Sequence, residues 1–454
     1  MIGEALDRLL PSRQTRRAAE RDTDKAARRR HLEAAAGGRR GTGWGGAGPL
    51  TEDIAAGGPM VMRRARHLHR NNAHAAHGVG NWTGALVGRG IRPAVQDARA
   101  DYRRRVADAF ESWTEQADIT AVTDLAGLQR QIAQHLVVDG EALAILHDTG
   151  DGLRLQVIPP ELLDWSKTAE LSDSRVIRNG VELDADGRRL AYWILPEAPQ
   201  TSFNAGASVR VDARDVLHVF HPMGAGQVRG LSWLAPVVVT ANELDQLTDA
   251  LLTGAKVAAM HAGFITRVNE SPDAEDFSEN MSLEPGAMRV LPGGTDVKFN
   301  SPEQAAQVGE FLKHQLRTFA AGMGLPEHLL SGDLSEANYS SLRAGLLPFR
   351  QRVEQVQHAT LVPQFLRPVW RRWLAAEIAA GRLDASPDTR AEWIMPAHYQ
   401  VDPQKDLEAT RTALELRLMS RSEAISARGR NPDDLRDEIA ADDAAAPANG
   451  GADD

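Results

Sequence analysis

The sequence predicts an α+β protein in which helices and antiparallel strands fill the first half and long helices dominate the second. Three observations support this prediction. Apolar residues recur at three- and four-residue spacing in several early segments, which is typical of amphipathic helices. Strand-like runs separated by Asn-Gly and Asp-Gly turns occupy residues 140–222. After residue 230, two long helical segments bracket a short β-like stretch.

Helices are predicted along most of the N-terminal third, after a basic arm. Residues 12–48 are rich in arginine and then in glycine, a composition that forms a core poorly, so we expect residues 1–48 to be flexible. Helical periodicity then covers residues 51–80, 95–113 and 125–138.

The strands of residues 140–222 are predicted to be antiparallel. Asn179-Gly180 and Asp186-Gly187 lie between alternating apolar residues, the strongest local signal for a β-hairpin. Residues 141–148 and 153–160 flank a further turn, and residues 209–222 add one or two strands. We expect this β region to pack beside the helices.

Two long helices are predicted next. The first runs from Trp233 to Met260, a rod of roughly 40 Å at the usual rise per residue. A small β module follows, with a hairpin around residues 292–294, and a second helix starts at Ser301, its expected cap by residue type. The polar side chains that we single out on the two helices are Lys256, Glu310, Lys313, His314 and Arg317.

The C-terminal third begins with a loop at residues 325–341 and a long helical segment. Pro348, Pro363 and Pro368 lie inside that segment, and because each removes a backbone donor and clashes one turn back, we expect kinks or breaks there. A strand-like stretch at 392–403 and a final pair of helices follow.

Composition excludes several classes of protein. The formal net charge of the 454 residues is −10, which argues against a strongly basic nucleic-acid binder. The chain has no cysteine, so it has no disulfide and no thiolate zinc site. No apolar run reaches the length of a membrane span, and the N-terminal residues are too charged for a signal peptide, so we expect an intracellular product without membrane contact.

Motifs for catalysis are missing. The sequence lacks the Gly-x4-Gly-Lys-Ser/Thr loop that cradles phosphates and the Gly-x-Ser-x-Gly turn of serine hydrolases. Asp245 and Asp249 share a helix face, but such carboxylates are usually solvated. We therefore expect no catalytic residues and no cofactor.

Four histidines form the remaining candidate for chemistry. They are His67, His69, His74 and His77. In one continuous helix, three of them line up, and the alternative function is then a metal-dependent hydrolase. No cysteine or nearby carboxylate completes the set, and a structural helix explains the segment equally well.

Three blocks of sequence resemble the lambda-type portal proteins of tailed bacteriophages. They are RARHLHRNNAHAAHGVGNWTGALVGRGIRP, DVLHVFHPMGAGQVRGLSWLAPVV and GMGLPEHLLSGDLSEANYSSLRAGLLPFRQ. The likeness implies a ring of subunits, usually twelve, around an axial channel at one capsid vertex. The parts that it implies are a wing (49–230), two stem helices (231–260 and 301–326), a clip (261–300), a tunnel loop (327–340), a kinked helix returning to the wing (341–400) and a crown (401–440). Residues 441–454 are expected to be a disordered acidic tail because of their acidic, Ala- and Gly-rich composition.

The resemblance also implies a site and partners. The tunnel-loop residues that we single out are Ser331, Gly332, Asp333, Leu334, Ser335, Glu336, Ala337, Asn338 and Tyr339. Rings of Asp333 and Glu336 are then expected to keep phosphate binding weak, because like charge repels DNA. Lys313 and Arg317 either touch phosphates or pair with acids of a neighbouring subunit, and we favour pairing.

The implied partners are further copies of the chain, double-stranded DNA in transit, the large terminase subunit at the clip, a head-tail adaptor, the major capsid protein and the scaffold. The implied location is the portal vertex of the virion, after assembly in the cytoplasm of a bacterial host. A third possibility is a DNA-binding module that uses the basic arm, which predicts tight, salt-sensitive binding lost on deletion of residues 1–48.

Overall fold

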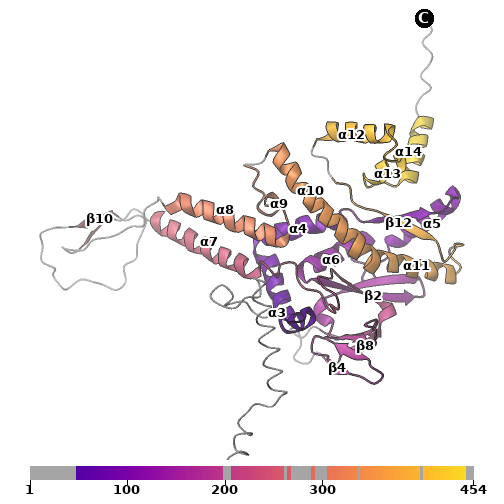
Figure 1. Ribbon diagram of the computed structural model, residues 1–454, viewed down its shortest axis with the longest axis horizontal. Coiled ribbons are helices and arrows are strands. Elements are labelled where there is room, and N and C mark those ends of the chain that lie inside the picture. Colours follow the sequence, from indigo (N-terminus) through magenta and orange to yellow (C-terminus); the bar gives the residue numbers. More distant parts are fainter. Residues whose placement is uncertain are drawn as a thin grey trace, which may run out of the picture. The chain divides into compact units, whose positions relative to one another are not determined.

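The computed structural model describes residues 48–197, 206–259, 263–266, 288–291, 304–335, 338–398 and 402–445. The chain divides into two units at Asp53, and almost all described residues belong to the second. The expected basic arm lies outside the described residues up to residue 47, as do the end of the acidic tail after Ala445 and most of the expected clip. The second unit is a mixture of helices and sheets, so the predicted α+β class is confirmed (Figure 1).

Four helices begin the described chain. Their bounds are α3 (Leu50–Asn71), α4 (Ala73–Val87), α5 (Ala100–Thr114) and α6 (Leu125–Val138). The predicted helix over residues 51–80 is in fact two, because the Asn72 side chain accepts a hydrogen bond from the Ala75 N–H at 2.7 Å and so caps α4. Asp124 caps α6 in the same way.

The strands of this region are antiparallel, as predicted, and they form two sheets. The three-stranded sheet has the order β3 (Gly152–Ile158), β2 (Glu141–Thr149), β9 (Val216–Phe220). The five-stranded sheet has the order β4 (Ala169–Glu170), β5 (Val176–Arg178), β6 (Val181–Leu183), β7 (Arg189–Ile194), β8 (Val209–Asp212). Single 3₁₀ turns at η2 (Pro160–Leu162) and η3 (Ala213–Asp215) connect them. Asn179 and Gly180 make the predicted hairpin between β5 and β6, both with positive φ, at 48° and 85°.

The structure also contains a two-stranded antiparallel sheet, of which the sequence predicted only one strand. It pairs β1 (Arg92–Gln96) with β12 (Arg390–Ile394), so that Ala94 faces Glu392. β12 coincides with the strand-like stretch near residue 392, whereas β1 was missed. Pro93 lowers the strand signal of β1, although a proline is tolerated in an edge strand such as this.

Two antiparallel helices, α7 (Val238–Ala259) and α8 (Gln304–Met323), lie side by side (Figure 1). The prediction that α7 starts at Trp233 was wrong by about one turn. Residues 233–237 instead form turns, and the Trp233 N–H donates to the Val137 carbonyl at 3.1 Å. Among the α7 residues whose burial is described, Val238, Ala241 and Leu244 in the first half are buried, whereas Leu252 farther along is 52% exposed.

Between α7 and α8 the described residues form a parallel pair of short strands, β10 (Gly263–Thr266) and β11 (Met288–Leu291). This pair lies in the segment expected to contain a β module. The predicted hairpin at residues 292–294 and the predicted cap Ser301 lie outside the described residues.

The proline-rich segment is helical from end to end. After α9 (His328–Ser331) it consists of α10 (Tyr339–Val356), the π-helix η4 (Gln357–Leu366) and α11 (Arg367–Ala379). The expected breaks are therefore wrong. Pro348 lies inside α10. Around Pro363 and Pro368 the helix continues with the wider hydrogen-bond spacing of a π-helix, from residue i to residue i−5. One such bond runs from the Arg367 N–H to the Val362 carbonyl.

Three further helices complete the described part of the chain: α12 (Pro403–Glu415), α13 (Arg421–Ser426) and α14 (Pro432–Ala445). α14 continues beyond residue 440, so residues 441–445 are helical and not part of a disordered tail. It buries no residue, and its contacts with α5 are ion pairs.

The main hydrophobic core joins one face of the three-stranded sheet to the helices α3 to α11, η4 included. Its aromatic centre includes Phe110 and Trp373, whose ring centroids are 4.9 Å apart. Tryptophan, phenylalanine and leucine side chains such as Trp82, Phe319 and Leu330 extend this core to the ends of α8 and α9. Among the described helices, none has the length and apolar character that a bilayer crossing requires.

Candidate functional site

The four histidines are divided between two helices. His67 and His69 belong to α3, and His74 and His77 to α4, so the alignment expected of one continuous helix is not formed. His69 is half-buried, which lowers its pKa. Within the described part of the chain no three His, Asp or Glu side chains are grouped to hold a metal ion, so the metal-hydrolase alternative is not favoured.

His77, on α4, instead contacts the segment that precedes the predicted tunnel loop. His77 Nδ1 lies 3.1 Å from the Leu330 carbonyl oxygen. Asn81 donates to the Leu329 carbonyl at 2.6 Å, and the Trp82 indole N–H donates to the Met323 carbonyl at 3.0 Å. Three side chains of one helix therefore fix the end of α8 and all of α9.

The described residues of the loop between α9 and α10 are exposed, and the hydrogen bonds within their turn are local. Residues 332–335 are exposed, and Leu334 is 57% exposed. The hydrogen bonds of this turn are local: the Asp333 N–H donates to Ser331 Oγ at 3.1 Å, and the Ser335 N–H donates to Asp333 Oδ1 at 2.9 Å. Two of the predicted loop residues, Glu336 and Ala337, lie outside the described residues.

The loop ends at a well-formed helix start. Asn338 and Ser341 form a capping box in which each side chain accepts from the other's backbone N–H. Tyr339 is 37% exposed; its hydroxyl accepts a hydrogen bond from Arg343 at 2.9 Å, and the Lys405 ammonium lies 5.2 Å from its ring centroid. The predicted loop residue Tyr339 thus contacts α12 on one side and solvent on the other.

A polar cavity of about 170 Å³ brings part of the predicted stem and loop together. Its lining consists of Lys313, Arg317, Glu327, His328, Asp333, Ser341 and Leu342. The pKa of Asp333 is held below its usual value by hydrogen bonds from Ser335 and, to a smaller extent, by the charge of Lys313. Burial lowers the pKa of His328.

Three of the predicted stem residues do not line this cavity. They are Lys256, Glu310 and His314, which are exposed. The sequence missed Glu327, His328 and Ser341 as neighbours of Lys313, because only the fold of α8, α9 and α10 brings them together. Their one signal in the sequence is that all three fall in the third block of the portal resemblance.

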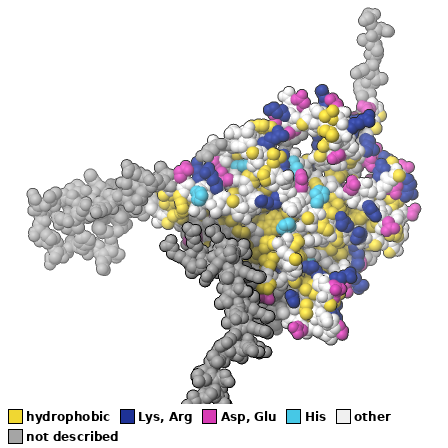
Figure 2. Space-filling view, viewed as in Figure 1, with side chains coloured by type: hydrophobic (Ala, Val, Ile, Leu, Met, Phe, Trp, Pro, Cys, Tyr) yellow, Lys and Arg dark blue, Asp and Glu magenta, His cyan; other side chains and the backbone are white. Residues whose placement is uncertain are grey.

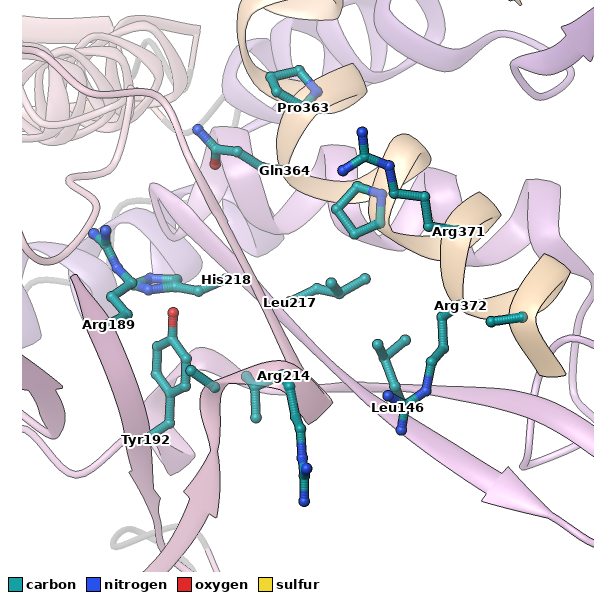
Figure 3. A pocket seen from close by; sticks show the side chains of 14 residues that line it. Leu146, Arg189, Tyr192, Arg214, Leu217, His218, Pro363, Gln364, Arg371 and Arg372 are labelled. Atoms are coloured by element: carbon teal, nitrogen blue, oxygen red, sulfur yellow. The ribbon is translucent and has the colours of Figure 1, made fainter. Parts of the chain in front are cut away.

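A second cavity, of about 560 Å³, lies between β7, β9 and the helices η4 and α11 (Figure 3). Four arginines line it, of which Arg372 pairs with Asp148 and Asp215. His218 also lines it, but its Nε2 is bound to buried Glu141. None of its lining residues is a serine, threonine, aspartate or glutamate, so the cavity offers arginine donors and not a nucleophile with its base.

Charges of both signs are mixed over the face shown in Figure 2. Basic and acidic side chains are intermingled on that face. On the face shown, this mixture differs from the basic stripe that is typical of a nucleic-acid-binding module.

Comparisons with known proteins identify the family. A family model described as phage portal protein, lambda family, matches residues 37–357. The chain is 27% identical over 403 residues to the probable portal protein of Halomonas phage phiHAP-1, covering 84% of this chain and 76% of that protein. It is 25% identical over 363 residues to portal protein B of Escherichia phage lambda, covering 67% of this chain and 68% of that protein.

A solved structure is also similar. It is the neck of an empty gene transfer agent particle with C6 symmetry, with a TM-score of 0.44 and 19% identity over 87% of this chain and 97% of that chain. The family model extends over more than half of the 454 residues, from before α3 through the end of α10, and so includes the cavity between α8 and the loop. The chain belongs to the lambda family of phage portal proteins.

Proposed function

We propose that copies of this chain close into a ring at one vertex of a phage capsid, and that the loop between α9 and α10 lines the axial channel for double-stranded DNA. Membership of the portal family supports the ring and the channel. The observation that carries the role of the loop is its exposure: residues 332–335 and Tyr339 are accessible, while α4 anchors the segment just before them.

The chemistry of the loop suits a surface past which DNA slides. Leu334 presents an apolar side chain that makes no hydrogen bond to phosphate, and Gly332 and Ser335 are small. The net charge of −10 repels a polyanion at long range, so that the DNA is not gripped along its length.

The other parts of the subunit take the roles expected of a portal. The helices α7 and α8 form the stem, the segment between them the clip, residues 54–230 most of the wing, and α12 to α14 the crown. The clip contacts the large terminase subunit and later a head-tail adaptor, and the wing contacts the major capsid protein and the scaffold. The subunit acts in the virion as a structural component without a catalytic role or a cofactor, after assembly in the host cytoplasm.

Cysteine chemistry tests the placement of the loop, because the natural sequence contains no cysteine. Leu334→Cys introduces one thiol into the loop, and Val122→Cys introduces one at an 80% exposed position between α5 and α6. In purified full-length assemblies, a short bis-maleimide is expected to join neighbouring Leu334→Cys subunits into covalent dimers and to leave Val122→Cys subunits as monomers. Equal yields of dimer from the two variants contradict a loop that meets its copies around an axis.

A further inference from the structure

We propose that the cavity between β7, β9, η4 and α11 is a docking groove for a short acidic segment of a partner protein, in which carboxylates flank an apolar side chain. Arg189 and Arg371 bind the carboxylates, and Leu217 contacts the apolar side chain. The basis is the lining of this cavity of about 560 Å³, to which α7, α8 and the tunnel loop contribute no described residue. The inference goes beyond the proposed function, because it assigns a binding site outside the parts that form the channel.

Two of the four arginines of the groove have no carboxylate partner among the described residues. Arg371 is exposed on α11, and its side chain makes no ion pair or hydrogen bond within the described part of the chain. Arg189 donates to the Val228 carbonyl at 3.3 Å, but its buried Nε has no hydrogen-bond partner there. The other two, Arg214 and Arg372, lie beside aspartates. A bound carboxylate can therefore pair with Arg189 or Arg371 without displacing an existing partner.

Two neutral donors add to these cations. Gln364 Oε1 accepts a hydrogen bond from the Phe220 N–H at 2.9 Å, so its amino group is left to donate. The Tyr192 hydroxyl makes no hydrogen bond with another described residue, and burial raises the pKa of Tyr192 to about 12, so it remains a neutral donor at pH 7. Because the described lining includes no aspartate or glutamate, the groove complements an anion.

The part of the groove between the two arginines is apolar. Figure 3 shows Arg189 on the β7 side of the cavity and Arg371 on the α11 side, with Leu217 between those two sides. Further apolar side chains of the lining are Leu146, Val216, Pro363 and Pro368. A ligand that fills this space needs an apolar side chain between its charged groups, since a wholly charged ligand leaves the apolar surface uncovered.

A second cavity, of about 590 Å³, adjoins the groove and shares Leu146, Arg214 and Arg372 with it. A chain of several residues can continue from one cavity into the other, which a compact small molecule cannot. Asp148 and Asp215 line this second cavity, so it repels an anion. The ligand is therefore charged at one end of the groove only.

This uneven charge favours a peptide over DNA. Duplex DNA carries a negative charge about every 1.7 Å along its axis, so phosphates that follow the groove also meet Asp148 and Asp215. A peptide can place its carboxylates beside Arg189 and Arg371 and neutral residues beside the two aspartates.

The experiment measures binding of labelled peptides to the purified full-length protein by fluorescence anisotropy. The probes are a panel of short peptides in which one leucine lies between two glutamates at different spacings. We expect at least one peptide to bind the wild type and to bind Arg371→Gln about tenfold more weakly, because the variant loses charge-assisted hydrogen bonds. Replacing the glutamates of that peptide with glutamine, or its leucine with serine, should also weaken binding.

The matched control is Arg367→Gln. Arg367 is exposed on the same helix and does not line the groove, so this variant loses the same charge and is expected to bind the peptide as the wild type does. Urea denaturation of Arg371→Gln should match that of the wild type, because Arg371 has no partner in the described part of the chain. The proposal is overturned if no peptide binds the wild type more tightly than Arg371→Gln, or if Arg367→Gln weakens binding equally.

Other occupants of the groove give different results. A short DNA duplex that binds more tightly than every peptide, and whose binding is lost in Arg371→Gln, identifies a phosphate site and overturns the proposal. Particle images in which a neighbouring copy covers the groove identify an interface between copies and also overturn it. Wild-type protein that forms no ring contradicts the proposed function alone, because the peptide assay applies equally to a single subunit.

Discussion

The guanidinium of Arg229 lies against the carboxylate of Glu141 in the protein interior, where their side chains are 1% and 0% exposed and the Nε–Oε1 distance is 2.9 Å. His218 Nε2 approaches the same carboxylate at 3.0 Å, and the Gly230 N–H donates to it at 2.8 Å. The network joins β2 and β9 to the segment that leads into α7. It therefore ties the segment that precedes α7 to the three-stranded sheet.

Replacing Arg229 with methionine tests how much this network contributes. Because Glu141 is then buried without its cation, Arg229→Met is expected to lower the free energy of unfolding by roughly 3–5 kcal/mol. Urea denaturation of variants in the same assembly state measures the loss. The matched control is Arg411→Met, which breaks the exposed pair with Glu415 and should cost less than about 1 kcal/mol; similar losses in the two variants contradict a stabilising role for the buried network.

The same network predicts a loss of stability in acid. Burial lowers the pKa of His218 below its ordinary 6.5, so the unfolded chain gains a proton that the folded chain does not, and stability falls as the pH drops below 6.5. Glu141 is also buried, but the charge of Arg229 and the contact with His218 lower its pKa to about 2, so a second loss follows as the pH falls from 4.5 toward 2.

Measurement of the thermal midpoint between pH 8 and pH 5 checks the first of these losses. His218→Gln retains a donor to Glu141 but does not titrate, and its midpoint should fall less steeply below pH 6.5 than that of the wild type. The thermal midpoint of this variant should still fall somewhat as the pH drops, because burial also lowers the pKa of His221 and His398. A variant with an unchanged slope contradicts the assignment to His218.

Comparing substitutions of two buried tryptophans measures how strongly the hydrogen bond from α4 holds the end of α8. Trp82 and Trp373 are 1% and 0% exposed, but of the two only the indole of Trp82 has a hydrogen-bond acceptor, the Met323 carbonyl. Changing either to phenylalanine removes a similar volume. Trp82→Phe should therefore cost about 1 kcal/mol more than Trp373→Phe in unfolding free energy.

Hydrogen exchange provides the structural check on that prediction. Amide protons of residues 320–331 should exchange faster in Trp82→Phe than in Trp373→Phe, since the lost bond holds that segment. Equal exchange in the two variants means that packing alone, and not the hydrogen bond, anchors the base of the loop.

The attachment of α14 is expected to weaken with salt. Arg103 pairs with Asp433 and Arg104 with Asp437, each at 2.7 Å, and α14 has no buried residue to add to these pairs. Exposed pairs are screened as the Debye length falls from about 10 Å at 0.1 M salt to about 3 Å at 1 M. Limited proteolysis within α14 should therefore accelerate as salt is raised.

Arg103→Ala should produce the same acceleration at low salt. The control is Arg105→Ala, because Arg105 is exposed on the same helix and its guanidinium donates to the Asp384 carbonyl, at 3.5 Å, and not to α14. Protection of α14 that is insensitive to both salt and Arg103→Ala contradicts attachment by these ion pairs.

Local signals explain most of the fold that could be predicted. The hairpin at Asn179-Gly180 was predicted correctly because those two residue types tolerate the positive φ of the turn. The split between α3 and α4 was missed because a capping asparagine inside an apolar pattern is a weak signal. The π-helix around Pro363 was missed because tertiary packing of residues such as Phe365, 1% exposed, holds the segment helical despite its prolines.

The features that the sequence did not predict depend on contacts between residues far apart in the chain. Nothing near β1 in the sequence points to β12, which lies about 300 residues farther along. For the site, the resemblance singled out the loop, and the polar face of the predicted helix singled out the cations of α8. The sequence did not predict that Asp333 and Lys313 line one cavity, because their proximity depends on how the chain folds between α8 and α10.

Imaging of single particles of the purified full-length protein tests the central claim most directly. We expect closed rings with an axial opening, in which density for residues 332–335 lies at the narrowest part of the channel. A monodisperse monomer at high concentration and at every salt concentration, or rings in which these residues face away from the axis, contradicts the claim.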